Sequence, residues 1–381
     1  MRIVYIYSTL TTKGGTERMI IEKANYLAEH FGYDVTIVTC FQHAVEPNFF
    51  YVSPKVSQNN LEIPFFSQYK YKYPKRLWMK WQMNRLLIKS INEVVKQIDP
   101  DILIGVSRFK ANFISTIKCR AKKIIECHVI RENTFNKFDE SKIFPFRIFM
   151  KIYEFFYLRT MERNADVIVA LTEKDKEFYK WAKHKLAIPN FSTMQITHYS
   201  DCTSKRVIAV GHLEWIKGIG RLIEIWKIVS DRYPDWHLDI FGEGRMEETL
   251  KKLIKIYGLN NVTIHDCTSD ISQEYAKSSI CAVTSYFEGF SLVLLEAMKH
   301  GLPCVAFDCP FGPSTIINDA QCGFLVEDGD TRLFAERLCY LIENEELRKH
   351  FSKAAIEKAK YFDVDIIMNK WKELFEELTR S

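Results

Sequence analysis

The sequence predicts an α/β protein of two domains, each a parallel β-sheet with helices on its faces. At 381 residues the chain is longer than one typical domain. In both halves, short apolar or β-branched runs of strand length alternate with longer segments of helical periodicity. A polar stretch, 191–205, interrupts this alternation before it restarts. We therefore expect a first domain over 1–190, a linker over 191–205 and a second domain over 206–362.

The first domain begins with an apolar run over 2–8, which is too short for a signal peptide and predicts a strand. A helix over about 16–31 should end at Gly32, and strands should follow at 34–40, 101–107, 122–128 and 166–172. Gly14 and Gly15 open the helix, where free backbone N–H groups and the helix dipole favour phosphate. A plain turn would also explain two glycines. The Gly-x-Gly-x-x-Gly fingerprint is absent, so a nicotinamide cofactor is not supported.

Residues 61–90 form a basic and aromatic segment with a single acid, Glu62. Its candidate contact residues are Lys70, Lys72, Lys75, Arg76, Trp78 and Trp81. A second segment, 144–157, contains seven aromatic residues. Interleaved aromatics and cations suit a membrane surface or a lipid-linked acceptor, whereas core packing beside a solvated basic face is the alternative. No nucleic-acid-binding module accompanies these segments, so we expect no nucleic acid partner.

The distribution of charge and of cysteine indicates the kind of partner and the redox compartment of the protein. The net charge of +5 divides into 31 Lys+Arg against 19 Asp+Glu over 1–190, a balance of +12, and 22 against 29 over the remainder, a balance of −7. This asymmetry suggests that the first half faces an anionic partner, although a random surface distribution is the alternative. Ten cysteines lie scattered without metal-ligand spacing, as in a reduced cytosolic protein. No apolar run is long enough to predict a membrane-spanning helix.

The second domain restarts with a strand at 207–210 and the turn Gly211-His212 leading to Lys217-Gly218. A helix to about 233 and a strand at 237–241 follow. The run 280–286 reads as a buried strand, Ser291 as the N-cap of the next helix, and 304–307 as another strand. Ligands of parallel sheets bind outside the carboxyl ends of the strands, which is where Glu288 falls.

Glu296 lies within this helix among almost exclusively apolar neighbours. A helix that is apolar on all sides is normally buried, and a carboxylate is rarely buried without a partner. Glu296 is therefore either a structural residue with a buried partner or a ligand for a polyhydroxylated molecule. A second glutamate eight positions earlier, Glu288, favours the ligand.

The stretch from Glu288 to Glu296, two glutamates with seven residues between them, resembles the paired-glutamate motif of the family 4 retaining glycosyltransferases (glycosyl transferases group 1) that build bacterial surface polysaccharides. The resemblance covers nearly the whole chain and is strongest over 206–329. It implies the GT-B fold, in which two Rossmann-like domains face each other across a cleft. It also implies that residues 363–381, an amphipathic helix, cross back to the first domain.

The resemblance further implies transfer of a hexose or N-acetylhexosamine from a nucleoside-diphosphate sugar, commonly UDP-linked. The acceptor would be a saccharide or lipid-linked saccharide. No cofactor and no essential metal are expected, because the diphosphate clamp supplies positive charge. The protein would be cytoplasmic, with contact to an anionic membrane at its inner face.

The family also implies roles for individual residues. Glu296 would bind the ribose, Glu288 would lie near the donor hexose, and Lys217 would clamp the diphosphate. His128, at the end of its strand, would hydrogen-bond the donor sugar. The other donor-binding positions are Gly14, Gly15, Gly211, His212, Gly289, Phe290 and Ser291.

His212 departs from the pattern, since the family usually has an arginine there. Histidine carries charge only near or below a pKa of about 6.5, and it lacks the bidentate fork of arginine. The departure supports one alternative function, a catalytically silent binding subunit. The other alternative is a nucleotide-sugar epimerase of the same fold.

Overall fold

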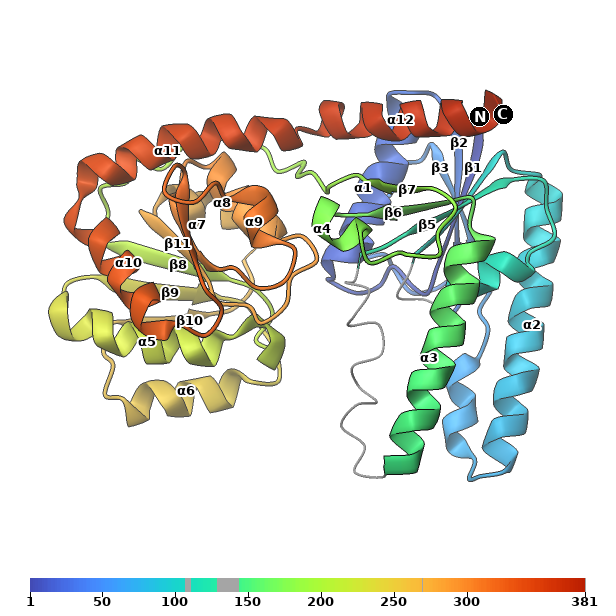
Figure 1. The fold of residues 1–381 in the computed structure, drawn as a ribbon, viewed down its shortest axis with the longest axis horizontal. Helices are drawn as coiled ribbons and strands as arrows, with labels where there is room; N and C mark the ends of the chain where they lie inside the picture. Colours follow the sequence, from blue (N-terminus) through green and yellow to red (C-terminus); the bar gives the residue numbers. More distant parts are fainter. Residues whose placement is uncertain (107–110, 129–143, 269, 381) are drawn as a thin grey trace. The chain divides into compact units, whose positions relative to one another are not determined.

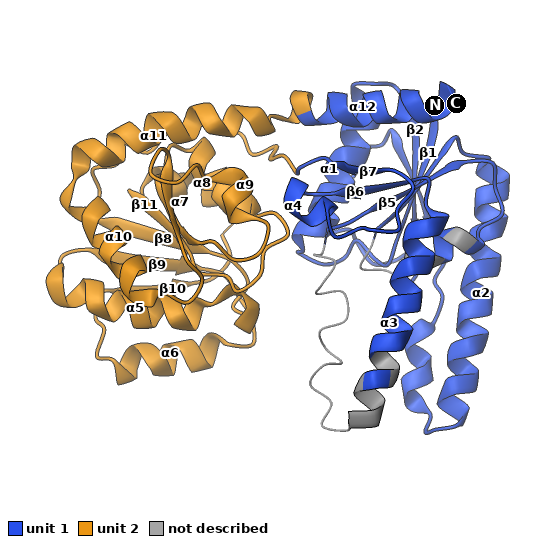
Figure 2. Cartoon of the chain, in the orientation of Figure 1, with its two compact units in different colours: residues 1–189, 367–381 blue, residues 190–366 orange. Residues whose placement is uncertain are grey.

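The computed structural model describes residues 1–106, 111–128, 144–268 and 270–380, and these form two compact units (Figures 1 and 2). Unit 1 comprises residues 1–189 and 367–381, and unit 2 comprises residues 190–366. Each unit is built on one sheet of parallel strands covered by helices. The predicted α/β fold class is therefore confirmed.

The sheet of unit 1 has seven strands in the order β3-β2-β1-β4-β5-β6-β7. The strands are β1 (Arg2–Tyr7), β2 (Asp34–Thr39), β3 (Val56–Asn60), β4 (Ile102–Val106), β5 (Lys122–Glu126), β6 (Val167–Ala170) and β7 (Lys185–Ala187). The helices are α1 (Gly15–Glu29), α2 (Lys75–Ile98), α3 (Phe144–Asn164), α4 (Glu173–Lys176) and most of α12 (Val364–Arg380), with 3-10 helices at Phe65–Lys70 and Ala111–Thr116. Ser107, the last residue expected in its strand, lies outside the described residues.

Unit 2 has a sheet of six parallel strands in the order β10-β9-β8-β11-β12-β13. They are β8 (Arg206–Val210), β9 (His237–Phe241), β10 (Val262–His265), β11 (Ile280–Val283), β12 (Cys304–Phe307) and β13 (Gly323–Val326). The helices are α5 (Ile219–Arg232), α6 (Glu247–Ile256), α7 (Ile271–Ala276), α8 (Leu292–Lys299), α9 (Pro313–Ile316), α10 (Thr331–Glu343) and α11 (Glu345–Ala359), with 3-10 helices at Trp215–Lys217 and Lys360–Phe362.

Apolar side chains on both faces of the central strands explain the two sheets. Strands β4, β11 and β12 are buried along their whole length, as parallel strands covered by helices on both faces require. In unit 2 the core lies between the sheet and helices α5 and α10, where Trp226 and Phe334 are fully buried. In each sheet the strand order reverses direction once, between β1 and β4 in unit 1 and between β8 and β11 in unit 2. This is the Rossmann-type arrangement that binds ligands at the reversal.

Residues 191–205, expected as a linker, lie within unit 2. Phe191 and Cys202 are buried, and the backbone oxygen of Ser192 accepts a hydrogen bond of 2.7 Å from Lys299 Nζ. Helix α12 buries the apolar face expected of it, and its Trp371 lies 4.9 Å from the ammonium of Lys23 on α1. The last turns of the chain therefore belong to the core of unit 1.

All ten cysteines lie within the described residues and are free thiols, eight of them buried. None of the helices in the described ranges has the length and apolar character needed to cross a membrane.

Candidate active site

The reversal of strand order in unit 2 brings Lys217 and Glu288 into contact. Neighbouring strands β8 and β11 end at the same edge of the sheet; the loop after β8 carries Lys217 and the loop after β11 carries Glu288. Lys217 Nζ lies 2.8 Å from Glu288 Oε1, and the hydroxyl of Ser285 donates to the same oxygen at 2.6 Å. Both charged side chains are partly shielded from solvent: 26% of the Lys217 side chain and 10% of the Glu288 side chain are exposed. The sheet thus places a cation and a carboxylate together where such folds bind ligands.

Gly218 explains how the two loops come so close. Its φ of +64° lies in the left-handed region, and a Cβ there would overlap the backbone oxygen of Thr284. The Thr284 hydroxyl in turn donates to the Gly218 oxygen at 3.0 Å. A glycine directly after Lys217 is therefore what lets the lysine reach Glu288.

The backbone of Glu288 is held from its other side by the loop that follows β12. Glu288 and Phe311 form an isolated parallel bridge, and Gly312 approaches so closely that a Cβ would lie 2.9 Å from that of Glu288. Nearby, burial and then the charge of Glu288 raise the pKa of the Cys309 thiol to about 12. Cys309 is therefore a neutral thiol beside the carboxylate at neutral pH.

Helix α8 begins three residues after Gly289 and carries the second predicted glutamate. Ser291 occupies its N-cap position, as predicted, but its side chain accepts no hydrogen bond from the helix. Glu296 is 5% exposed, so the expectation of a buried carboxylate agrees with the structure. The ring of Phe290 packs against Phe362, 5.6 Å between centroids, and so faces the interior of unit 2.

Gly211 and His212 lie at the end of β8. The Lys217 side chain passes over Gly211, with its Cδ 3.7 Å from where a Cβ would stand. His212 is exposed, and its backbone oxygen accepts from Glu214 N at 2.7 Å. The positions assigned to the diphosphate clamp in unit 2 are therefore neighbours.

In unit 1, Gly14 and Gly15 mark the N-terminus of α1, as expected. The carboxylate of Glu17 folds back onto them, because a Cβ on Gly14 would overlap Glu17 Oε2. The other oxygen of Glu17 accepts a 2.9 Å hydrogen bond from the Tyr7 hydroxyl. A carboxylate therefore occupies the helix N-terminus, where it is favoured by the helix dipole.

His128 lies after β5, in a buried charged cluster of unit 1. Its side chain is 3% exposed, and its Nε2 is 2.8 Å from Glu126 Oε1. Glu126 also contacts Lys23 of α1, and both are almost fully buried. Burial, and then the charge of Lys23, hold the pKa of His128 well below its usual value, and burial lowers the pKa of Lys23. His128 is therefore neutral at neutral pH.

The basic and aromatic segment of unit 1 forms an exposed surface on the first half of α2 and the 3-10 helix before it. No residue of α2 before Leu87 is buried, and Figure 1 shows α2 and α3 extending beyond the sheet. Trp78 and Trp81 are 53% and 54% exposed. Lys70, Lys72 and Lys75 are also exposed, and Arg76 stacks over the ring of Tyr69 at 4.3 Å. These six candidate contact residues lie on the 3-10 helix, the loop after it and the first half of α2, and we call them together the α2 surface.

Arg221 is a residue near the site that the sequence reasoning missed. It is 8% exposed, and its guanidinium donates to the backbone oxygens of Thr284 and Ser285, each at 2.6 Å. It also pairs with Asp328 at 2.7 Å. The sequence feature that could have identified Arg221 is its position on the buried apolar face of α5, beside Leu222 and Ile225.

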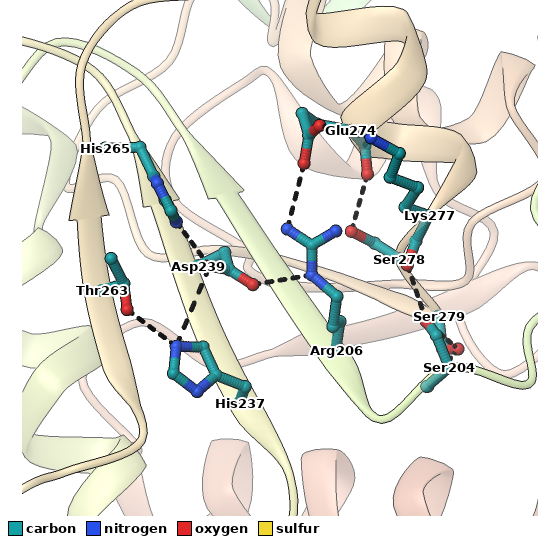
Figure 3. Close-up of polar contacts among 10 residues, drawn as sticks. All are labelled: Ser204, Arg206, His237, Asp239, Thr263, His265, Glu274, Lys277, Ser278 and Ser279. Atoms are coloured by element: carbon teal, nitrogen blue, oxygen red, sulfur yellow. Dashed lines mark hydrogen bonds and ion pairs between the residues drawn. The ribbon is translucent and has the colours of Figure 1, made fainter.

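A second polar cluster crosses β8, β9 and β10 (Figure 3). Asp239 accepts from Arg206 Nε at 2.7 Å and contacts His265 Nε2 at 2.5 Å, while Arg206 also pairs with Glu274 of α7 at 3.0 Å. Most of the cluster lies towards the amino ends of the strands, away from the edge that carries Lys217 and Glu288, which indicates a structural role. In the described part of the chain, no group of three or more His, Cys, Asp or Glu side chains is placed to hold a metal ion.

Comparison with known proteins agrees with this architecture. Residues 197–358 match the family described as "Glycosyl transferases group 1". The chain is 29% identical over 379 residues to an uncharacterized glycosyltransferase of Haemophilus influenzae, covering 97% of this chain and 99% of that protein. It is 28% identical over 389 residues to the amylovoran biosynthesis glycosyltransferase AmsD of Erwinia amylovora, covering 98% and 99%.

The fold is also similar to that of a mutant of S. aureus TarM, solved in complex with Fondaparinux, alpha-GlcNAc-glycerol and UDP. The TM-score is 0.77 at 17% identity, over 98% of this chain and 99% of that one. The likeness covers both units. The chain therefore has the GT-B fold, and its residues 197–358 are similar to the glycosyl transferases group 1 family.

Proposed function

We propose that the protein is a retaining glycosyltransferase of the family 4 type that transfers a hexose or N-acetylhexosamine from a UDP-sugar to a saccharide or lipid-linked saccharide during surface polysaccharide synthesis. The observation that carries the proposal is the Lys217–Glu288 contact at the strand-order reversal of unit 2, with the buried Glu296 on the helix that follows. AmsD acts, by its name, in amylovoran biosynthesis, and the TarM complex contains UDP. The name of AmsD supports a polysaccharide product, and the UDP in the TarM complex supports a UDP-sugar donor.

Lys217 supplies the positive charge for the donor diphosphate. An ammonium held at the ligand edge of the sheet stabilises charge that develops on the leaving phosphate. Glu288 pairs with this ammonium, so the diphosphate would compete with the carboxylate for it. Gly211 leaves room beside the lysine, and His212 is proposed to assist. In unit 1 the amides of Gly14 and Gly15 are also proposed to assist, which requires the Glu17 carboxylate to move away from them. No metal is required in this proposal.

The two glutamates have separate roles. Glu296 accepts hydrogen bonds from the ribose hydroxyls, for which a buried carboxylate is a strong acceptor. Glu288 lies near the donor hexose, with Ser291 and the amides of Gly289 and Phe290 around it. His128 of unit 1 is proposed to contribute a neutral imidazole to the donor sugar, which requires its buried side chain to become accessible.

Transfer with retained configuration takes place on the front face of the donor. The acceptor hydroxyl oxygen forms the new bond to the anomeric carbon as the bond to the phosphate oxygen breaks. The acceptor proton moves to the departing phosphate, so no protein base is needed.

A donor panel tests the proposal. Purified protein is incubated with UDP-, GDP- and ADP-sugars, with and without EDTA, and both binding and the release of free nucleoside diphosphate are followed. We expect one UDP-sugar to bind and be hydrolysed slowly, with EDTA having no effect. Glu296→Gln should weaken binding about tenfold or more, the value of a lost charge-assisted hydrogen bond, whereas the exposed Glu336→Gln should not. Absence of binding by every sugar nucleotide would favour a silent subunit.

We further propose that the α2 surface contacts an anionic membrane. Its exposed tryptophans suit the headgroup region, and each cation near an anionic surface contributes about 1 kcal/mol. Replacing Lys70, Lys72, Lys75 and Arg76 with serine should reduce sedimentation with phosphatidylserine vesicles at least about tenfold, and added salt should do the same. The control replaces four exposed lysines of unit 2, namely Lys251, Lys252, Lys255 and Lys353. Equal loss in both variants would refute a specific membrane surface.

A further inference from the structure

Four side chains of unit 2 form one continuous stack beside the Lys217–Glu288 pair. The guanidinium of Arg221 lies between the rings of Phe307 and Tyr286, with its carbon 4.1 and 4.0 Å from their centroids. The ring of Trp215 lies on Tyr286 at 4.5 Å between centroids and 8° between planes. The stack thus runs from the buried strand β12 outward and ends at an indole.

Hydrogen bonds of Arg221 and of the Tyr286 backbone hold the stack in place. Arg221 is fixed by its two backbone acceptors and by Asp328, so it supports Tyr286 as a preorganised base. The backbone N–H of Tyr286 donates to the oxygen of Ile216 at 2.9 Å, which ties the loop of Trp215 to that of Tyr286. The indole therefore needs little further ordering to bind a ligand, which favours affinity.

Trp215 nevertheless remains 59% exposed, two residues from Lys217. It borders a small pocket with Glu214, Met246, Leu250 and Tyr286, and the side chain of Glu214 is itself 43% exposed. A flat, rigid, apolar ring beside a carboxylate matches a pyranose, which has one face of C–H groups and a rim of hydroxyls. Stacking covers the C–H face, and the carboxylate accepts from the hydroxyls.

We propose that Trp215 is the stacking platform for a pyranose ring of the saccharide acceptor. This inference rests on the proposed glycosyltransferase function for the identity of the ligand. The groups assigned to the donor, Glu288 and Glu296, are buried, whereas Trp215 lies at the exposed rim of the same edge. Both the acceptor and the nucleotide of the donor extend outward from the reacting centre and could meet the rim. The carboxylate of Glu214 beside Trp215 repels the anionic nucleotide and accepts hydrogen bonds from a neutral pyranose, which favours the acceptor.

The test uses the full chain and methyl α-glycosides of glucose, galactose and N-acetylglucosamine as probes. The indole N–H signal of Trp215 is identified in an NMR spectrum by its absence from Trp215→Ala. We expect at least one glycoside to shift this signal. The affinity of that glycoside is measured by saturation transfer to the sugar protons. It should fall about fivefold or more in Trp215→Ala and less in Trp215→Phe. Tyr361→Ala, at another exposed aromatic ring, is the matched control and should bind normally.

UDP affinity is measured on the same variants and should not change. The proposal is overturned if no glycoside shifts the indole signal, or if Trp215→Ala weakens UDP and leaves glycoside binding intact, since the platform would then serve the nucleotide. Failure of the wild-type protein to bind any sugar nucleotide would refute the proposed function instead. The glycoside titration does not depend on nucleotide binding, so the two failures can be told apart.

Discussion

Replacing Gly218 with alanine should disrupt unit 2 far more than the same change at Gly258. The two glycines have almost the same φ, +64° and +65°. Alanine in the left-handed region costs about 1–2 kcal/mol at either position. At Gly258 nothing lies within 4 Å of the added Cβ, so the backbone term is the whole cost.

At Gly218 the added Cβ overlaps the oxygen of Thr284, although real Cβ atoms keep about 3.0 Å. Relief of that overlap must move backbone, because Thr284 is held by its own hydrogen bond to Gly218 and by Arg221. Overpacking of this kind costs about 1–3 kcal/mol, and weakening the two hydrogen bonds about 1–2 kcal/mol more. We therefore expect Gly218→Ala to lose about 3–7 kcal/mol of the free energy of unfolding, against about 1–2 kcal/mol for Gly258→Ala.

Urea unfolding of both variants, followed by circular dichroism, measures the difference. Gly218→Ala should also lose the slow release of nucleoside diphosphate, because Lys217 is adjacent, whereas Gly258→Ala should keep it. If the two variants are destabilised equally and retain equal activity, the close approach of the two loops does not build the site.

Other predictions concern buried charge. Arg221→Met leaves two buried backbone oxygens and Asp328 without their donor, so it should cost about 3–5 kcal/mol in urea unfolding. Arg332→Met removes an exposed helix pair and should cost little; equal losses would contradict the assigned role of Arg221. Burial lowers the pKa of His128 and of His300, so below a pH of about 6.5 the unfolded chain takes up protons that the folded chain does not. Stability should therefore be complete above that pH and fall towards pH 5.5, by up to about 1.4 kcal/mol per pH unit for each histidine. His128→Gln should flatten this slope and the exposed His350→Gln should not; an unchanged slope in His128→Gln would show that the imidazole is not held neutral.

The central strands could be predicted from sequence because burial on both faces leaves an apolar run. Strand β3 was not predicted, because Val56–Asn60 lies at the sheet edge with only its first residue buried. Helix α2 was not assigned either. Its apolar contacts come only from its second half, and aromatic and basic side chains hide the periodicity of the first.

The pairing of Lys217 with Glu288 follows from strand order, which the resemblance supplied. The features that hold the pair do not have a local signature. Gly218 is required by Thr284, 66 residues away, and Arg221 is buried because carbonyl groups of a different loop satisfy it. The lowered pKa of His128 depends, after burial, on the charge of Lys23, which a strand-end position alone does not reveal.

The most direct test of the account is titration of UDP, and of the hydrolysed UDP-sugar, into Lys217→Met and Glu288→Gln, with turnover measured alongside. Loss of the ammonium should remove a charge-assisted contact worth about 1.5–3 kcal/mol, and so weaken UDP about 10- to 100-fold. Glu288→Gln should bind UDP at least as tightly as the wild-type protein, because the competing carboxylate is neutralised, and should release nucleoside diphosphate much more slowly. Wild-type affinity and wild-type turnover in both variants would contradict the claim that this pair is the donor site.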